Sequence, residues 1–184
     1  LNQAEVLKKF NLGPSELIRL SGLVKSGDTS NCEAIAARIY FNQLLSDSTR
    51  RQSTWYNSAL DYGYSIVRSC IARSVASHGL IASLGVFHHS ELNNFNLVDD
   101  LIECYRPFVD LYVLKTVRMR HIGKEFDENL SREDRVLLIQ VINENVRIRN
   151  LSYSIKHSID ITVESFIAAF QKEDINLFEL PKFC

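Results

Sequence analysis

The sequence contains few of the residues that interrupt helices, with three prolines and seven glycines among its 184 residues. So little punctuation favours long helices over many short strands. Cysteine is scarce as well, and none of the four cysteines lies in a Cys-x-x-Cys pair. This spacing argues against a zinc site and against a disulfide framework, so it indicates a reduced, cytosolic compartment. The four are Cys32, Cys70, Cys104 and Cys184.

An excess of charge of one sign is also missing, since the formal net charge is −1. If the protein binds nucleic acid, its positive charge must therefore be concentrated locally. The sequence has no signal peptide and no apolar run long enough to cross a membrane, and we expect no membrane partner. A hydrophobic fraction of 46% in a chain of this length predicts one globular domain over residues 1–184.

Apolar residues recur at helical spacing along most of the chain, which predicts an all-α fold with no sheet of three or more strands. Gly63 lies inside one of these segments and costs about 1 kcal/mol relative to alanine, so we expect a packing reason for it. The expected helices cover residues 1–10, 15–24, 32–45, 55–77, the turns that carry 99–103, then 108–120, 131–146 and 151–171, with an extended tail at 177–181.

Residues 85–110 contain the densest group of chemically active side chains. Two adjacent histidines, His88 and His89, precede a carboxylate cluster of Asp99, Asp100 and Glu103. Residues three or four apart share one face of a helix, so these acids can meet. Carboxylates beside an imidazole are suitable ligands for a divalent metal. The alternative is a solvated helix N-terminus, where the helix dipole favours acids.

Several familiar sites are absent from the sequence. It has no Gly-x-Ser-x-Gly nucleophile elbow, no P-loop and no glycine-rich dinucleotide loop. It also lacks a His-Glu-x-x-His word and a pair of Glu-x-x-His words, which excludes common zinc-protease and di-iron arrangements.

Three separate motifs resemble the CRISPR adaptation integrase, a metal-dependent CRISPR-associated endonuclease, and most of all its type II branch. The first is Gly-Asp-x-x-Asn-x-Glu-Ala at residues 27–34, and the second is the block Asn-Ser-Ala-Leu-Asp-Tyr-Gly-Tyr at 57–64. The third joins Gly-x-x-His at 85–88 to Asn-x-Phe-Asn-Leu-x-Asp-Asp-Leu-x-Glu at 93–103. Two positions depart from the pattern: Cys32 stands where type II relatives often carry Arg, and Asp61 replaces Asn.

The resemblance implies that Glu33, His88 and Glu103 are catalytic and bind Mg²⁺ or Mn²⁺. Asp100 and Asp99 are then supporting residues, and His89 is a neighbour or a phosphate contact. Taken alone, Glu33 is better explained by its place in the first turn of a helix. Five arginines close to these segments are candidates for contacts with the DNA backbone, although each can also pair with an acid, Arg106 with Glu103 or Asp110. They are Arg38, Arg51, Arg68, Arg73 and Arg106.

The resemblance further implies an enzyme that inserts foreign DNA spacers into the CRISPR array by attack of a 3′ hydroxyl on a phosphodiester. Its expected partners are spacer and repeat DNA, a second copy of the chain and a small ferredoxin-like CRISPR-associated protein, in the cytoplasm of a prokaryote. The family's N-terminal β domain is not seen, so the chain is expected to be a C-terminal catalytic fragment. The rival expectation is a non-catalytic helical DNA-binding or scaffolding module.

Overall fold

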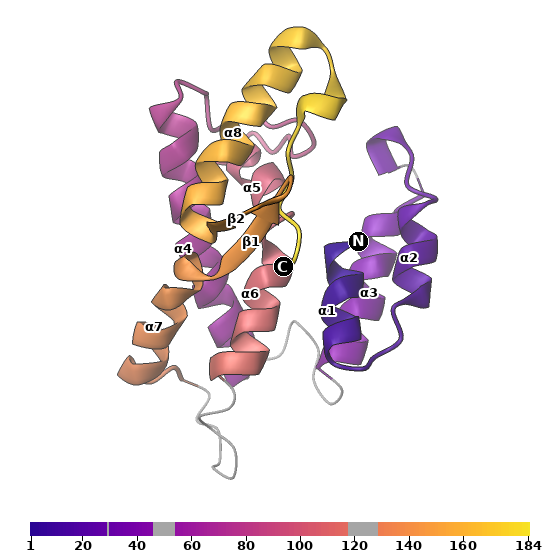
Figure 1. Cartoon of the computed structure of the whole chain (residues 1–184), viewed down its shortest axis with the longest axis vertical. Coiled ribbons are helices and arrows are strands. Elements are labelled where there is room, and N and C mark those ends of the chain that lie inside the picture. The colour runs from indigo at the N-terminus through magenta and orange to yellow at the C-terminus, as the bar shows by residue number, and fades with distance from the viewer. Residues whose placement is uncertain (29, 46–53, 118–128) are drawn as a thin grey trace.

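The computed structural model describes residues 1–28, 30–45, 54–117 and 129–184. Within them the chain is a bundle of helices with one small antiparallel hairpin, which confirms the all-α expectation (Figure 1). None of the helices in these ranges is both long and apolar enough to cross a bilayer.

The N-terminal part consists of three helices packed on one another. They are α1 (Asn2–Lys9), α2 (Ser15–Ser21) and α3 (Cys32–Leu44), with the 3-10 turn η1 (Ser26–Asp28) between the last two. A small hydrophobic cluster joins them and extends to Leu114. Figure 1 shows these helices side by side at one flank of the molecule.

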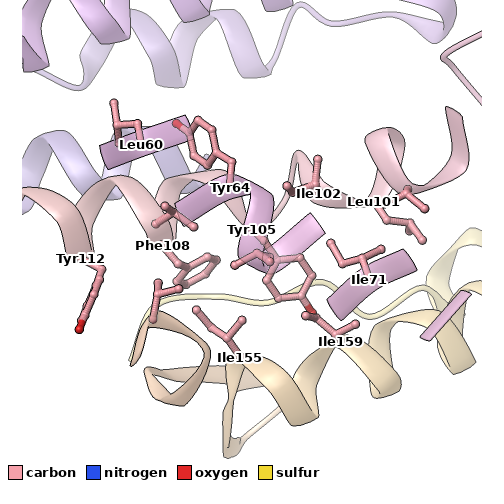
Figure 2. Packing of buried hydrophobic residues seen from close by; sticks show 14 of the residues in the cluster. Leu60, Tyr64, Ile71, Leu101, Ile102, Tyr105, Phe108, Tyr112, Ile155 and Ile159 are labelled. Atoms are coloured by element: carbon pink, nitrogen blue, oxygen red, sulfur yellow. The ribbon is translucent and has the colours of Figure 1, made fainter. Parts of the chain in front are cut away.

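The larger hydrophobic cluster surrounds α4 (Trp55–Ser77), against which the remaining helices pack. Figure 2 shows part of this packing, with Tyr105 directed toward α8. The Tyr105 hydroxyl lies 3.2 Å from Ser158 Oγ and 3.0 Å from Thr162 Oγ1, so the buried ring keeps its polar end satisfied. The elements around α4 are α5 (Asn96–Ile102), α6 (Arg106–Tyr112), the π turn η2 (Val113–Val117), α7 (Arg132–Ile139), η4 (Gln140–Asn143) and α8 (Ile155–Lys172).

The helix expected over residues 131–146 is too long, and the one expected from 151 begins too early. Residues 145–154 instead form β1 (Asn145–Ile148) and β2 (Leu151–Ser154). In β1, buried Val146 and Ile148 alternate with exposed residues, which is the period of a strand. The turn holds Arg149 at φ 54°, and Ser154 then caps α8.

The expected helix over 108–120 also changes form along its length. It begins earlier, at Arg106, and passes into the π turn at Val113, while residues 118–120 lie outside the described ranges. The expected extended tail at 177–181 begins in the short turn η5 (Ile175–Leu177) and continues to a β-bridge between Lys182 and Arg147.

Two contacts fix α3, α4 and α6 relative to one another. Buried Asp110 on α6 accepts hydrogen bonds from the hydroxyls of Tyr40 on α3, at 2.7 Å, and Tyr64 on α4. Gly63 allows α4 and α6 to approach closely, because a Cβ there would lie 2.6 Å from Val109 Cγ1. The packing reason expected for this glycine is therefore confirmed, and the helix that begins beside Glu33 is tied to the one that follows Glu103.

Candidate functional site

The carboxylate of Asp100 in α5 holds residues 86–88 of the loop between α4 and α5. Its Oδ2 accepts hydrogen bonds from the backbone N–H groups of Val86, at 2.5 Å, and Phe87, at 3.1 Å. Its Oδ1 accepts from the backbone N–H of His88 at 3.0 Å and lies 2.7 Å from His88 Nδ1. One side chain therefore fixes both the path of the loop and the position of the imidazole.

The pKa of Asp100 reflects this arrangement. Burial alone would raise it, but the hydrogen bonds from Phe87, His88 and Val86 together lower the pKa below its ordinary value. The carboxylate is therefore charged at neutral pH. A charged carboxylate at Nδ1 favours the imidazole tautomer with the proton on Nδ1 and the lone pair on Nε2.

The loop also depends on close backbone approach at Gly85. A Cβ at this position would overlap the carbonyl oxygen of His88 and lie 2.8 Å from Asn96 Cβ and 2.9 Å from Asp100 Oδ2. Asn96 closes the loop by donating to the carbonyls of Ser83, at 3.0 Å, and Ser90, at 2.9 Å. Glycine is thus required for the loop to reach α5.

His88 and its neighbour are distinguished by these contacts. The His88 side chain is 40% exposed and meets the edge of the Phe87 ring at a centroid distance of 5.7 Å. His89 follows it and is exposed. Because Asp100 contacts His88 Nδ1, the structure gives His88 the carboxylate support that a metal-binding histidine commonly has.

Asp99 faces another partner. Its carboxylate forms a two-pronged ion pair with Arg68 of α4, at 2.6 and 3.0 Å, and accepts a hydrogen bond from Asn93 at 2.7 Å. The hydrogen bond from Arg68 is the main reason that the pKa of Asp99 is lowered. The Arg68 guanidinium also lies over the Phe95 ring, 4.8 Å from its centroid. Asp99 therefore attaches the loop to α4.

Glu103 stands at the C-terminal end of α5 with 54% of its side chain exposed. Arg106 lies one turn further along, and its Nε is 3.0 Å from Oε1 of Glu103. This is one of the two ion pairs that the sequence predicted for Arg106. The pKa of Glu103 is raised, first by the partial burial of the carboxyl group, although more than half of the side chain remains exposed. The charges of Glu33 and Asp99 raise it further, while Arg106 and His88 lower it.

Glu33 is exposed in the first turn of α3. Asp28 caps this helix, accepting hydrogen bonds from the backbone N–H groups of Cys32 and Glu33, each at 2.8 Å. The sequence-based analysis did not assign this role to Asp28, although a Gly-Asp turn before a helix is a capping signal.

The three candidate ligands come from the first turn of α3, the loop after α4 and the end of α5, and the structure does not gather them around one point. Across residues 1–28, 30–45, 54–117 and 129–184, no group of three or more His, Cys, Asp or Glu side chains has the spacing to hold a metal ion. Their chemistry and their exposure suit a divalent cation: two carboxylates that disfavour each other's charge and an imidazole supported at Nδ1. The fit therefore lies in the chemistry of the donor set.

The candidate DNA-contacting arginines fall into three groups. Arg68 and Arg106 are engaged with Asp99 and Glu103. Arg38 and Arg73 are exposed, and Arg51 lies outside the described residues. A role in binding DNA stays a prediction for all of them.

Comparison with known proteins places this arrangement in a family. The family model for the CRISPR associated protein Cas1 matches residues 20–146, which is more than half of the chain. The chain belongs to the Cas1 family. It is 35% identical to the CRISPR-associated endonuclease Cas1 of Neisseria meningitidis serogroup C over 99% of its own length and 60% of that relative. The chain therefore spans less than two thirds of this Cas1 relative.

Solved structures agree on the fold. A CAS1 protein from Thermotoga maritima aligns with a TM-score of 0.76 at 23% identity, over 94% of this chain and 63% of that one. A casposase bound to integration product aligns with a TM-score of 0.67 at 19% identity, over 82% of this chain and 52% of that one. The sequence-based resemblance and the helical fold are both confirmed, while the assignments of ligands and cofactor stay predictions.

Proposed function

We propose that this chain carries the reaction site of a divalent-metal-dependent DNA endonuclease and integrase of CRISPR adaptation. In this proposal the 3′ hydroxyl of a captured DNA strand attacks a phosphodiester of the CRISPR array, forming one phosphodiester bond and releasing one 3′ oxygen. Two observations support it: the endonuclease name of the Neisseria relative, and the structural likeness to a casposase bound to integration product.

The observation that carries the proposal is the contact between Asp100 and His88. A surface histidine that only solvates the loop needs no carboxylate at Nδ1. Here the largely buried carboxylate of Asp100 contacts the imidazole ring and three consecutive backbone N–H groups. Such a contact favours the tautomer that leaves the Nε2 lone pair free to bind a metal.

In the proposed site, Glu33, His88 and Glu103 hold Mg²⁺ or Mn²⁺. When bound, the ion supplies a Lewis acid that polarises the phosphate and stabilises the attacking or leaving oxygen. The chain's own residues do the rest. Asp100 sets the tautomer of His88, Glu103 and Glu33 supply negative charge, and Arg106 balances part of the charge of Glu103.

Integration at two ends needs two such sites held at a fixed separation. We therefore include in the proposal a homodimer, spacer and repeat DNA, and a small ferredoxin-like CRISPR-associated partner, acting in the prokaryotic cytoplasm. One site per chain follows from a single Glu33, His88 and Glu103 set, so the dimer supplies the second.

One observation favours the rival, a non-catalytic helical DNA-binding module: the candidate ligands do not stand at metal-binding distances. The two functions differ in their response to Mn²⁺. A catalytic site binds the ion and cleaves DNA only in its presence, whereas a binding module holds DNA equally well with chelator.

The test titrates Mn²⁺ into the 184-residue chain by calorimetry and measures cleavage of a branched DNA with and without chelator. Glu33→Gln, His88→Ala and Glu103→Gln are expected to lose both metal binding and metal-dependent cleavage. His89→Ala is the matched control and is expected to keep both. Loss with His89→Ala but not with His88→Ala would reassign the histidine, and DNA binding without any Mn²⁺ binding would support the rival.

A further inference from the structure

The surface around β1 and the C-terminal tail carries more positive than negative charge. Residues 145–158 contain two arginines and a lysine with no aspartate or glutamate, and residues 181–184 add Lys182 without an acid. The whole chain has net charge −1, so this is a local departure from its composition. We call the exposed residues Asn145, Arg147, Arg149, Ser152 and Lys182 the hairpin face.

Backbone pairing places the central members of the hairpin face side by side. Arg147 is paired with Ser152 of β2 on one side and with Lys182 of the tail on the other. Arg147 and Lys182 exchange both of their backbone hydrogen bonds, each at 2.8 Å. In Figure 1 the hairpin lies between α8 and α6, and the yellow C-terminal tail runs beside it.

Two cations opposite each other in a sheet repel, which costs stability unless an anion lies between them. Within the described part of the chain, neither Arg147 nor Lys182 forms an ion pair, whereas Arg149 does, with Glu179 at 2.8 Å. The hairpin face therefore keeps two unmatched positive charges, with a hydroxyl and an amide beside them. Arginine, lysine, serine and asparagine together are the side chains that contact DNA phosphates and sugars.

Without a bound metal, the candidate reaction site offers less of this attraction. Its residues include the acids Glu33, Asp99, Asp100 and Glu103, and Arg68 and Arg106 are already paired with two of them. Unpaired cations elsewhere on the chain are therefore needed to attract DNA when no metal is present.

We propose that the hairpin face binds the sugar-phosphate backbone of duplex DNA, at a place separate from the candidate reaction site. This inference rests on the proposed function for the identity of the ligand as DNA. Duplex rather than single-stranded DNA is the occupant, because the hairpin face has cations and small polar groups but no aromatic ring on which a base could stack. Of the aromatic rings nearby, Tyr153 and His157 stack on each other at 5.3 Å, and Phe183 packs on Phe108 at 4.2 Å.

The test measures binding of a short duplex of arbitrary sequence by fluorescence anisotropy, in chelator, over a range of salt concentrations. The double variant Arg147→Gln/Lys182→Gln is expected to bind roughly ten-fold more weakly at about 0.1 M salt, with a logarithmic salt slope shallower by about two. The matched control Lys25→Gln/Lys172→Gln removes the same charge from exposed positions elsewhere and is expected to bind as the wild type does. The exchange Arg147→Lys/Lys182→Arg keeps the charge and is expected to retain binding.

Equal binding by the double variant and the wild type would overturn the proposal, as would equal weakening by the control. Preference for single-stranded DNA, with a larger loss from Tyr153→Ala, would overturn the assignment to a duplex. Because the assay contains chelator, it reports DNA binding without any contribution from a bound metal. Failure of the hairpin face is therefore distinguishable from failure of the metal site, which the cleavage assay reports.

Discussion

The Asp100 carboxylate contacts His88 at two atoms: it accepts a hydrogen bond from the His88 backbone N–H at 3.0 Å and lies 2.7 Å from the His88 imidazole Nδ1. The same carboxylate receives the two preceding N–H groups. A single residue of α5 therefore orders the loop and aims the ring. This couples the local structure of residues 85–88 to the chemistry proposed for His88.

Replacing Asp100 with Asn should weaken the proposed site without removing a ligand. An amide keeps the shape of the carboxylate but loses its charge and one acceptor, so the tautomer and orientation of His88 are no longer fixed. We expect Mn²⁺ affinity to fall about 10- to 100-fold, as for other carboxylate partners of metal-binding histidines. Calorimetric titration of Mn²⁺ measures the change.

Glu91→Gln is the control for Asp100→Asn, because Glu91 is an exposed acid of the same loop. It should leave Mn²⁺ affinity unchanged, and the circular dichroism of both variants should match the wild type. Unchanged affinity in Asp100→Asn would contradict the role given to this carboxylate.

Gly85→Ala tests the close approach of the loop to α5. Its Cβ would meet the backbone of His88 and the side chains of Asn96 and Asp100, all within 2.9 Å. The loop must move to admit it, so we expect loss of Mn²⁺ binding and a lower melting temperature. Gly13→Ala is the control, because its Cβ would meet only Gln43 Oε1 at 3.9 Å. Equal behaviour of the two variants would mean that the loop is not held as described.

The helices were predictable where their signals are local. α4 follows a capping threonine, Thr54, whose side chain accepts from Asn57 N–H, and its apolar spacing continues for six turns. The hairpin was not predictable in this way, because Val141, Ile142 and Val146 also fit a helical stripe. Residues 145–148 form a strand because they pair with Leu151–Ser154 and with Lys182. Lys182 lies far along the chain, so a local pattern does not reveal this pairing.

The same limit applies to the candidate site. The grouping of His88 with Asp99, Asp100 and Glu103 could be predicted, since these residues lie within one short stretch. Which of two adjacent aspartates supports the histidine could not, because the answer depends on Arg68, a residue of α4 that occupies Asp99. The metal-ligand roles of Glu33, His88 and Glu103 stay predictions.

Gly63→Ala should destabilise the bundle despite the better helix propensity of alanine. The substitution gains about 1 kcal/mol in propensity, but a Cβ 2.6 Å from Val109 Cγ1 overpacks a buried contact, which costs about 1–3 kcal/mol. We expect a net loss, measured by urea unfolding. Val109→Ala alone should cost about 1.5–2 kcal/mol through two lost methyl groups.

The double variant Gly63→Ala/Val109→Ala distinguishes overpacking from a general effect. Removing the Val109 methyl groups makes room for the new Cβ. The loss in free energy of unfolding for the double variant should therefore be smaller than the sum of the two single losses by at least about 1 kcal/mol. Simple additivity of the two losses would show that Val109 does not set the limit at Gly63.

Glu103→Gln should stabilise the protein at neutral pH when no metal is added. The folded-state pKa of Glu103 is raised above its ordinary 4.5, first by burial and then by Glu33 and Asp99. The folded chain therefore binds this proton more tightly than the unfolded chain does. In the pH window above 4.5 the stability of the wild type falls as pH rises through the raised pKa, and the full cost of the charge is present at neutral pH. Glutamine carries no charge, so its advantage should shrink as the pH is lowered toward that ordinary value.

Thermal unfolding of wild type and Glu103→Gln across this pH range measures the difference, with Glu91→Gln as a control for loss of one negative charge. Added Mn²⁺ should reverse the order at neutral pH, because binding to the folded wild type stabilises it by mass action and the variant lacks a ligand. If Glu103→Gln is less stable than the wild type without metal, the ion pair with Arg106 outweighs burial and the direction given for the Glu103 pKa is wrong. If Mn²⁺ stabilises both proteins equally, Glu103 is not a ligand.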